Sequence, residues 1–319
     1  MSFEPATEVA PDTFLIDAHY HRPRLAACYV VKGQSSAAVV ETGHAAAVPR
    51  ILAALEQVGV PRAGVSHVIV THVHLDHAGG AGALMRALPN ATLVAHPRGA
   101  RHLIDPAKLW AGTAAVYGVE ATRALYGEPI AVPANRVVEA PDGHCLDLGE
   151  RRFTFFDAPG HARHHLVVLD ESTRGVFTGD SFGLSYRELD SPRGPFFYPT
   201  TTPVQFDPLA LHSTLDRILA QRPEHVFLTH FGMVSGNLAA HAATLHRTID
   251  LFVRRAEAAP AGESRHGALK AALQEDLRVL LREHGSPLHA DQLQGLFDGD
   301  LELNAAGLEA WLDSRKAAS

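Results

Sequence analysis

The sequence predicts an α/β protein built as a sandwich of two β-sheets flanked by helices, and three observations support this prediction. Short apolar runs rich in β-branched residues, each the length of a strand, occur in two groups along the chain. Segments with helical spacing of apolar residues follow several of these runs. From about residue 236 the pattern is helical to the end. Because 319 residues exceed the usual size of one domain, we expect one large domain with an appendage.

The first half of the chain predicts strands at 13–17, 26–31, 36–41, 65–72 and 92–96. A helix is predicted over 48–60, because Ile51, Leu55 and Val58 share one helical face and Gly59 is a typical helix end. A second helix is predicted over 81–88. Residues 97–133 have a helical and irregular pattern, which indicates an insertion.

The second half predicts strands at 135–140, 152–158, 165–170, 174–180 and 225–232. Residues 181–206 contain four prolines and predict a long loop, and loops of this length are usually functional or disordered. A helix is predicted over 207–221, with Asp207 as its N-cap and Pro208 at its first position.

Composition limits the classes of function. The formal net charge of -7 gives no electrostatic reason to bind nucleic acid or an anionic membrane. Two cysteines, Cys28 and Cys145, form no disulfide framework, so a reducing cytoplasm is the expected location. The acidic first residues contain no apolar signal segment, and the longest apolar runs are too short to span a bilayer.

The segment "THVHLDHAGG" (71–80) places three histidines and one aspartate within six positions. It follows a predicted strand and precedes a predicted helix, so it lies on a type of loop where functional residues are common. Imidazole and carboxylate groups together suit zinc, iron or manganese. Ordinary solvated loop histidines are the alternative interpretation.

Three later strand ends repeat this arrangement. "FFDAPGH" ends in His161, "GVFTGD" ends in Asp180, and "VFLTHFG" contains His230. With the first segment, four strand ends supply five histidines and two aspartates: His72, His74, Asp76, His77, His161, Asp180 and His230. The recurrence favours a metal site over coincidence.

The motifs "THVHLDHAGG", "APGH", "FTGD" and "LTHFG", in this order, resemble those of the metallo-β-lactamase-fold hydrolase superfamily, especially its glyoxalase II-like (hydroxyacylglutathione hydrolase) members. The resemblance covers about residues 13–235. It implies an αββα sandwich over 1–235, with the insertion 97–133 and a pocket loop 181–206, followed by a C-terminal helical extension over 236–319. It further implies two divalent metal ions, with zinc favoured and iron or manganese as alternatives.

The resemblance also implies a role for each ligand. His72, His74 and His161 would bind the first metal, Asp76, His77 and His230 the second, and Asp180 would bridge both. Two such cations generate hydroxide at neutral pH. Held between the metals that Asp76 and Asp180 bind, this nucleophile would attack a thioester, ester or lactone carbonyl of a small-molecule substrate.

Two departures from the family pattern occur in this chain. Glu41 stands where relatives often carry aspartate, and we expect it to hydrogen-bond to metal ligands. In "PGHARHH" (159–165), His165 falls on a family position and His164 replaces a glycine. For both histidines a polar loop role competes with a catalytic one.

The sequence limits the choice of substrate less than it limits the choice of metal ligands. Tyr186 and Tyr198, in the predicted loop, are candidates for residues that assist the reaction at the substrate carbonyl. Alternatively, they form only part of the pocket wall. Trp110 and "PFFY" (195–198) fit an apolar acyl pocket or plain core packing equally well. Residues 103–133 and "FYPTTTPVQFD" (197–207) resemble a branch of the superfamily that carries helical insertions and has no settled substrate.

Other functions remain open at this level. A persulfide dioxygenase of the same superfamily uses a single iron and retains the His-x-His-x-Asp-His motif. A sensory or binding protein on this scaffold is a third class. The helices after residue 236 are expected either to lean over the site or to form a homodimer contact.

Overall fold

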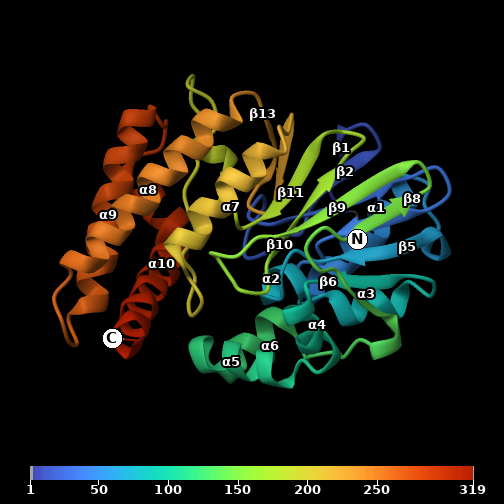
Figure 1. Ribbon diagram of the computed structural model, residues 1–319, viewed down its shortest axis with the longest axis horizontal. Helices are drawn as coiled ribbons and strands as arrows, with labels where there is room; N and C mark the ends of the chain where they lie inside the picture. Colours follow the sequence, from blue (N-terminus) through green and yellow to red (C-terminus); the bar gives the residue numbers. More distant parts are fainter. Residues whose placement is uncertain (1–2, 319) are drawn as a thin grey trace. The chain divides into compact units, whose positions relative to one another are not determined.

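Two β-sheets form the larger of two compact units in the structure, a computed structural model that describes residues 3–318 (Figure 1). This sheet unit consists of Met1–Asp157, His164–Gly179 and Arg222–Ser235, and the second, helical unit consists of Ala158–Arg163, Asp180–Gln221 and Gly236–Ser319. The sequence predicted one boundary near residue 235, whereas the chain passes from one unit to the other several times.

The first sheet has seven strands in chain order: β1 (Thr7–Ala10), β2 (Thr13–Asp17), β3 (Ala27–Lys32), β4 (Ala37–Val40), β5 (Val65–Ile69), β6 (Thr92–Ala95) and β7 (Val137–Glu139). Strands β1 to β4 pair antiparallel, and β4 to β7 pair parallel. The switch occurs because helix α1 (Val48–Gln57) carries the chain back before β5. The parallel strands therefore end at one edge, where ligands commonly bind.

The second sheet has six strands in the order β13 (Gly232–Ser235), β12 (His225–Leu228), β11 (Gly175–Gly179), β10 (Leu166–Asp170), β9 (Arg151–Asp157) and β8 (Cys145–Leu148). Strands β11 and β12 are parallel, and the other pairs are antiparallel. The prediction of a single strand over 225–232 is wrong at its C-terminal end. It stops at Leu228, and the chain turns through 229–231 into β13, which the sequence analysis did not separate.

Side chains of the first sheet alternate between two cores, as the two-residue period of a strand requires. On β3, Tyr29 and Val31 face the core between the sheets, while Cys28 and Val30 face the opposite side. The inner core is completed from the second sheet by aromatic residues, including Phe153, Phe155, Phe177 and Phe227. Two sheets packed through one apolar core confirm the predicted sandwich.

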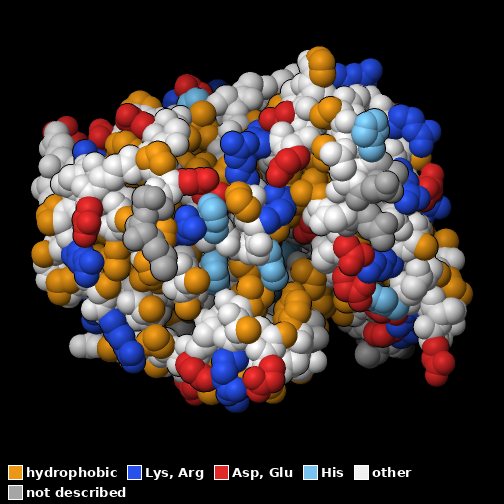
Figure 2. All heavy atoms as spheres, turned by 180° about the vertical axis from the view of Figure 1, so that it is seen from behind, with side chains coloured by type: hydrophobic (Ala, Val, Ile, Leu, Met, Phe, Trp, Pro, Cys, Tyr) orange, Lys and Arg blue, Asp and Glu red, His pale blue; other side chains and the backbone are white. Residues whose placement is uncertain are grey.

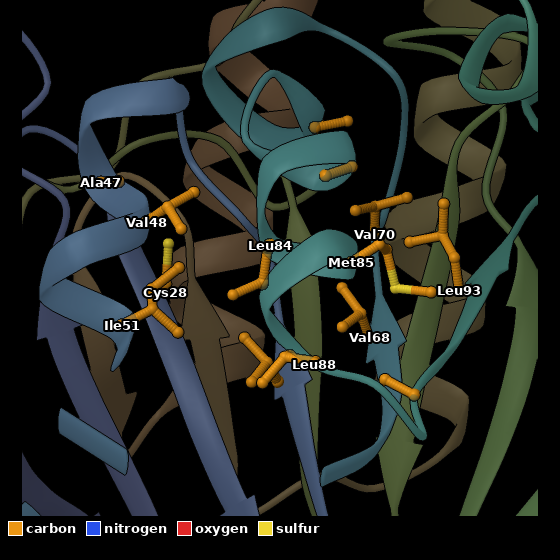
Figure 3. Packing of buried hydrophobic residues seen from close by; sticks show 14 of the residues in the cluster. Cys28, Ala47, Val48, Ile51, Val68, Val70, Leu84, Met85, Leu88 and Leu93 are labelled. Carbon is orange, nitrogen blue, oxygen red and sulfur yellow. The ribbon is translucent and has the colours of Figure 1, made fainter. Parts of the chain in front are cut away.

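Helices α1 and α3 (Ala81–Ala87) cover the outer face of the first sheet. Figure 3 shows Val48 and Ile51 of α1 beside Cys28, and Met85 of α3 near Val68 and Leu93. Each helix buries one apolar stripe in this way, which is the usual source of helix stability in a domain. The two glycines after the histidine-rich segment lead directly into α3.

The insertion predicted at 97–133 forms three helices in the sheet unit: α4 (Pro97–Ile104), α5 (Ala107–Tyr117) and α6 (Val119–Tyr126). Helix α4 packs against β6 and β7, and α5 packs against both α4 and α6 (Figure 1). The Trp110 indole donates to the carbonyl of Gly127 at 3.0 Å, which ties α5 to the end of α6.

The helical unit contains α7 (Pro208–Ala220), α8 (Leu238–Ala258), α9 (Arg265–His284) and α10 (Ala290–Ala318). Helix α8 packs against the other three, and α9 packs against α10. The predicted N-cap is confirmed, because the Asp207 carboxylate accepts a hydrogen bond from the amide of Ala210 at 3.1 Å. The predicted loop is largely irregular, with one short 3-10 turn over Arg187–Leu189.

Charges are mixed on the surface. On the face drawn in Figure 2, acidic and basic side chains alternate with hydrophobic ones, in keeping with the small net charge. Among the helices of the described chain, none combines the length and the apolar character that a membrane span requires.

We expect Phe153→Ala to lower the free energy of unfolding by about 3–5 kcal/mol, because the ring is fully buried between the sheets and its loss leaves a cavity. Denaturant unfolding followed by circular dichroism measures this change. Leu209→Ala is the control, because Leu209 is 78% exposed and its truncation is expected to change stability by less than about 0.5 kcal/mol. Equal effects of the two substitutions would contradict the assignment of the core.

Candidate metal centre

Three strand ends of the sheet unit bring polar side chains together. Glu41 follows β4, the histidine-rich segment follows β5, and His230 comes two residues after β12. Residues 75–78 of the histidine-rich segment form the short helix α2 (Leu75–Ala78), which the sequence analysis read as loop. This turn places Asp76 and His77 beside the strand ends and directs Leu75 and Ala78 toward the outer core.

Asp76, His77 and His230 form a group that fits one metal ion. One ligand atom of each lies within 4.8 Å of the others. The Nε2 atom of His230 is 3.4 Å, and that of His77 is 3.6 Å, from the Asp76 carboxylate. Two histidines and one carboxylate are a common donor set for zinc and for non-haem iron.

Hydrogen bonds identify which nitrogen of each ring can bind a cation. The Nδ1 of His230 donates to the Leu25 carbonyl at 2.7 Å, and the Nδ1 of His77 donates to the Glu41 carboxylate at 3.1 Å. A carbonyl oxygen and an ionised carboxylate only accept, so the Nδ1 atoms are the donors in these two bonds. In a neutral ring the Nε2 lone pair then faces the Asp76 carboxylate, and a cation between them can be bound by nitrogen and oxygen together. Such rings, anchored through their other nitrogen, are typical of metal ligands.

His72 is also held through its Nδ1 atom. The Thr71 hydroxyl donates to Glu41 at 2.5 Å and so accepts from the Nδ1 of His72 at 3.1 Å. The Nε2 of His72 is left as an acceptor and lies 2.9 Å from the Nδ1 of His74. Two ring nitrogens thus converge on one point from a single loop.

His164 and His165 lie next to His72 in the sheet unit. The His165 ring is fully buried and stacks on His72 at 4.7 Å, and His164 makes an edge contact with His74 at 5.7 Å. Gly179 leaves room for this packing, because a Cβ atom there would lie 2.6 Å from the Nε2 of His165. These contacts support the histidine-rich loop, and a catalytic role of His165 stays a prediction.

The helical unit holds the two remaining predicted ligands. The Nε2 of His161 lies 3.4 Å from the Asp180 carboxylate. The Thr200 hydroxyl donates to the Asp180 carbonyl at 3.3 Å and lies 3.0 Å from the Nδ1 of His161, from which it accepts. The Nε2 atom of His161 again faces a carboxylate, so this pair can offer a nitrogen and an oxygen donor to a cation.

A buried asparagine fixes the loop that carries Thr200. The side chain of Asn304, on α10, accepts from the Thr201 amide at 2.7 Å and donates to the Pro199 carbonyl at 3.2 Å. The C-terminal helix thereby sets the position of the residue that orients His161. The sequence analysis did not identify Thr200 or Asn304, and no local motif marks either residue.

Glu41 connects the strand ends in the sheet unit. Its carboxylate is almost fully buried and accepts from Thr71, from His77 and, at 3.3 Å, from the Thr229 hydroxyl. The Glu41 backbone has a φ of +63°, a conformation that residues other than glycine rarely adopt. The glutamate thus has the hydrogen-bonding position beside a ligand that the sequence predicted.

Tyr186 and Tyr198 lie in the interior of the helical unit. The Tyr186 hydroxyl donates to Asp300 at 3.1 Å, and the Tyr198 ring packs against Phe252 and Phe297. Burial raises the pKa of Tyr198 well above its usual value, so it stays neutral. These contacts describe core packing within this unit, and the carbonyl-assisting role of both residues stays a prediction.

Two other tyrosines, Tyr20 and Tyr126, lie within the electrostatic range of Asp76. Burial, followed by the charge of Asp76, raises the pKa of Tyr20 and of Tyr126 far above the usual range. Burial likewise lowers the pKa of His44, whose ring contacts Tyr20 at 5.5 Å. The sequence analysis did not single out these residues, because they lie far apart in the chain and follow no motif.

We expect Glu41→Gln to weaken metal binding about 10-fold or more, because an amide oxygen is a poorer acceptor than a carboxylate for the Nδ1 proton of His77. Zinc titration of metal-free protein against a fluorescent chelator measures the affinity. Glu8→Gln, on exposed β1, is the matched control and should bind as the unsubstituted protein does. Unchanged affinity of Glu41→Gln would exclude this role.

Comparison with known proteins agrees with this fold. The family model of the metallo-beta-lactamase superfamily matches residues 21–230, more than half of the chain. A metallo-beta-lactamase fold-containing protein, ST1585 of Sulfurisphaera tokodaii, is 26% identical over 222 residues, which cover 67% of this chain and 75% of that protein. The acyl-coenzyme A thioesterase MBLAC2 of Bos taurus is 30% identical over 115 residues, or 35% of this chain and 39% of that protein.

Solved structures resemble the chain over most of its length. The metallo-beta-lactamase family protein TTHA1429 from Thermus thermophilus has a TM-score of 0.68 at 18% identity and covers 97% of this chain and 96% of its own. At such identity the likeness concerns the fold alone. The match to the family model, together with the sandwich and its histidine-bearing strand ends, shows that this chain belongs to the metallo-β-lactamase superfamily.

Proposed function

We propose that the protein is a dinuclear metal-dependent hydrolase of a small carbonyl substrate, with His72, His74, Asp76, His77, His161, Asp180 and His230 as its metal ligands. The observation that carries this proposal is the direction of the ring nitrogens. In the pairs His230–Asp76 and His161–Asp180, the Nδ1 atom of the ring is bonded to a protein oxygen and the Nε2 atom faces a carboxylate at 3.4 Å. In the neutral ring, a cation bound between the nitrogen and the carboxylate would stabilise this arrangement.

Chain connectivity supports a single centre. Asp180 directly follows Gly179, the last residue of β11, and His230 follows the neighbouring parallel strand β12. The segment containing His161 joins the end of β9 to the start of β10, two strands that pair antiparallel at Asp157 and Leu166. These three connections therefore leave the second sheet at the same edge.

Two divalent ions held by these residues would lower the pKa of a shared water and supply hydroxide at neutral pH. Asp180 would set the spacing of the ions through its two carboxylate oxygens, while Asp76 would hold one ion from the α2 turn. Glu41 would keep the Nδ1 proton on His77, and Thr200 would do the same for His161. The chain would thus orient these two imidazoles through their Nδ1 atoms, as is common for metal-binding histidines.

The substrate we propose is a thioester, ester or lactone. The bovine relative is named as an acyl-coenzyme A thioesterase, which supports thioesters as the first compounds to test. The glutathione thioester of the glyoxalase II reaction belongs to the same panel. Zinc is our proposed metal and the cytoplasm our proposed location, both inferred from the sequence.

We expect Asp180→Ala to lose most bound metal and to lower kcat by at least 100-fold, because the carboxylate that joins the two ions is removed. Elemental analysis of the purified protein and a thioester assay measure both effects. Asp147→Ala, which removes an exposed carboxylate from β8, is the control and should leave both unchanged. A variant at Asp180 with two metals and full activity would refute the ligand assignment.

Metal content separates the hydrolase from the iron-dependent alternative. We expect close to two zinc ions per chain, loss of thioesterase activity after chelation, and recovery when zinc is added back. One iron per chain with oxygen uptake on a persulfide would instead support dioxygenase chemistry. Protein that takes up no metal after reconstitution would exclude both enzymes.

A further inference from the structure

A pair of buried tyrosines in the sheet unit holds one hydroxyl proton without an acceptor. The hydroxyls of Tyr20 and Tyr126 bond to each other, and the two residues are only 7% and 5% exposed. Two hydroxyls carry two protons, and a single hydrogen bond uses one of them. Among the described residues neither hydroxyl has another polar partner, so the second proton remains available for a bond.

A second unsatisfied group lies next to this pair. The Nδ1 atom of His44 is buried and has no hydrogen-bond partner among the described residues. Its ring contacts Tyr20 at 5.5 Å, as the Tyr126 ring does at 6.0 Å. Buried polar groups are nearly always paired in folded proteins, so two unpaired groups at one place indicate a missing partner.

Space for a ligand adjoins one member of the pair, Tyr126. A cavity of about 30 Å³ lies between α2, α3 and the helical insertion, and Tyr126 forms part of its wall. A single water needs roughly 10–15 Å³ of such space, so the cavity has room for two or three water-sized groups, such as the end of a short acyl chain. The remaining wall is mainly apolar, with Leu75, Ala78, Leu103, Trp110 and Ile130 among its residues.

We propose that Tyr20, Tyr126 and His44 form a binding subsite for a neutral oxygen, carbonyl or hydroxyl, on a small apolar acyl group. A tyrosine hydroxyl donates to such an oxygen, and the His44 nitrogen either donates to it or accepts from it, depending on the tautomer. All three groups are uncharged, because burial raises the pKa of both tyrosines, which keeps their hydroxyls protonated, and lowers the pKa of His44. The described residues that line the cavity include Glu128 and no lysine or arginine, so a carboxylate ligand is disfavoured.

The subsite deepens the proposed hydrolase function and rests on it, because α2 carries Asp76 on one face and lines the cavity with Leu75 and Ala78 on the other. A substrate with its acyl group in the cavity would lie beside the proposed metal ligand. The helical insertion, which supplies Tyr126 and Trp110, would then select the substrate.

The decisive variant is Tyr20→Phe combined with Tyr126→Phe. It removes both hydroxyls together and leaves neither one unpaired, so the fold should keep its stability. Tyr117→Phe is the matched control, because it removes a hydroxyl from a residue of the same insertion that is 42% exposed. Thermal unfolding and metal content verify that all proteins are intact.

Binding is measured first on metal-free protein, by NMR titration with propionamide and with propionate. We expect propionamide to bind more tightly than propionate, and the double variant to lose on the order of 10-fold in affinity for propionamide, as expected when a buried donor loses its bond. The Tyr117→Phe control should bind as the unsubstituted protein does. Failure of propionamide to bind, tighter binding of propionate, or equal binding by the double variant would each overturn the subsite.

Kinetics on short acyl thioesters separates the two proposals. Loss of a binding contact should raise KM more than it lowers kcat in the double variant. If no ester or thioester is hydrolysed but propionamide binding depends on the tyrosines, the subsite stands and the hydrolase proposal fails. If thioesters are hydrolysed with the same KM and kcat by the double variant, the hydrolase proposal stands and the subsite fails.

Discussion

The buried carboxylate of Glu41 is the interaction on which the candidate metal site of the sheet unit depends. It follows β4 and accepts hydrogen bonds from Thr71 after β5, from His77 on α2 and from Thr229 after β12. A carboxylate accepts and never donates, so each neighbour must direct a proton toward it. This one acceptor therefore joins the two sheets at their edge and also determines which ring nitrogen of two histidines can bind a cation.

The same principle recurs through both units. An acceptor on the protein holds the proton of one ring nitrogen, and the other nitrogen is left facing a carboxylate. The Leu25 carbonyl does this for His230, and the Thr200 hydroxyl does it for His161. The fold supplies these acceptors from backbone and loop positions that no ligand motif contains. A cation would complete each arrangement, so the arrangement of the donors supports the proposed metal site more than the number of histidines does.

Segments outside the two sheets also hold residues of the candidate site in position. In the helical unit, Asn304 holds the loop at Thr201, next to the threonine that orients His161. In the sheet unit, the insertion brings Tyr126 to Tyr20 and closes an apolar cavity behind α2. The sandwich thus provides the edge, while additions to it orient a proposed metal ligand and enclose the cavity that we propose for the substrate.

The sequence by itself determined the sandwich, its histidine-bearing strand ends and the position of Glu41, because strand periodicity and ligand motifs are local in the chain. It did not separate β12 from β13, since the turn at 229–231 lies within one apolar run. Thr200, Asn304 and the pairing of Tyr20 with Tyr126 were decided by the tertiary structure alone. These residues act through contacts across about 40 to more than 100 positions, and no local spacing rule describes such contacts.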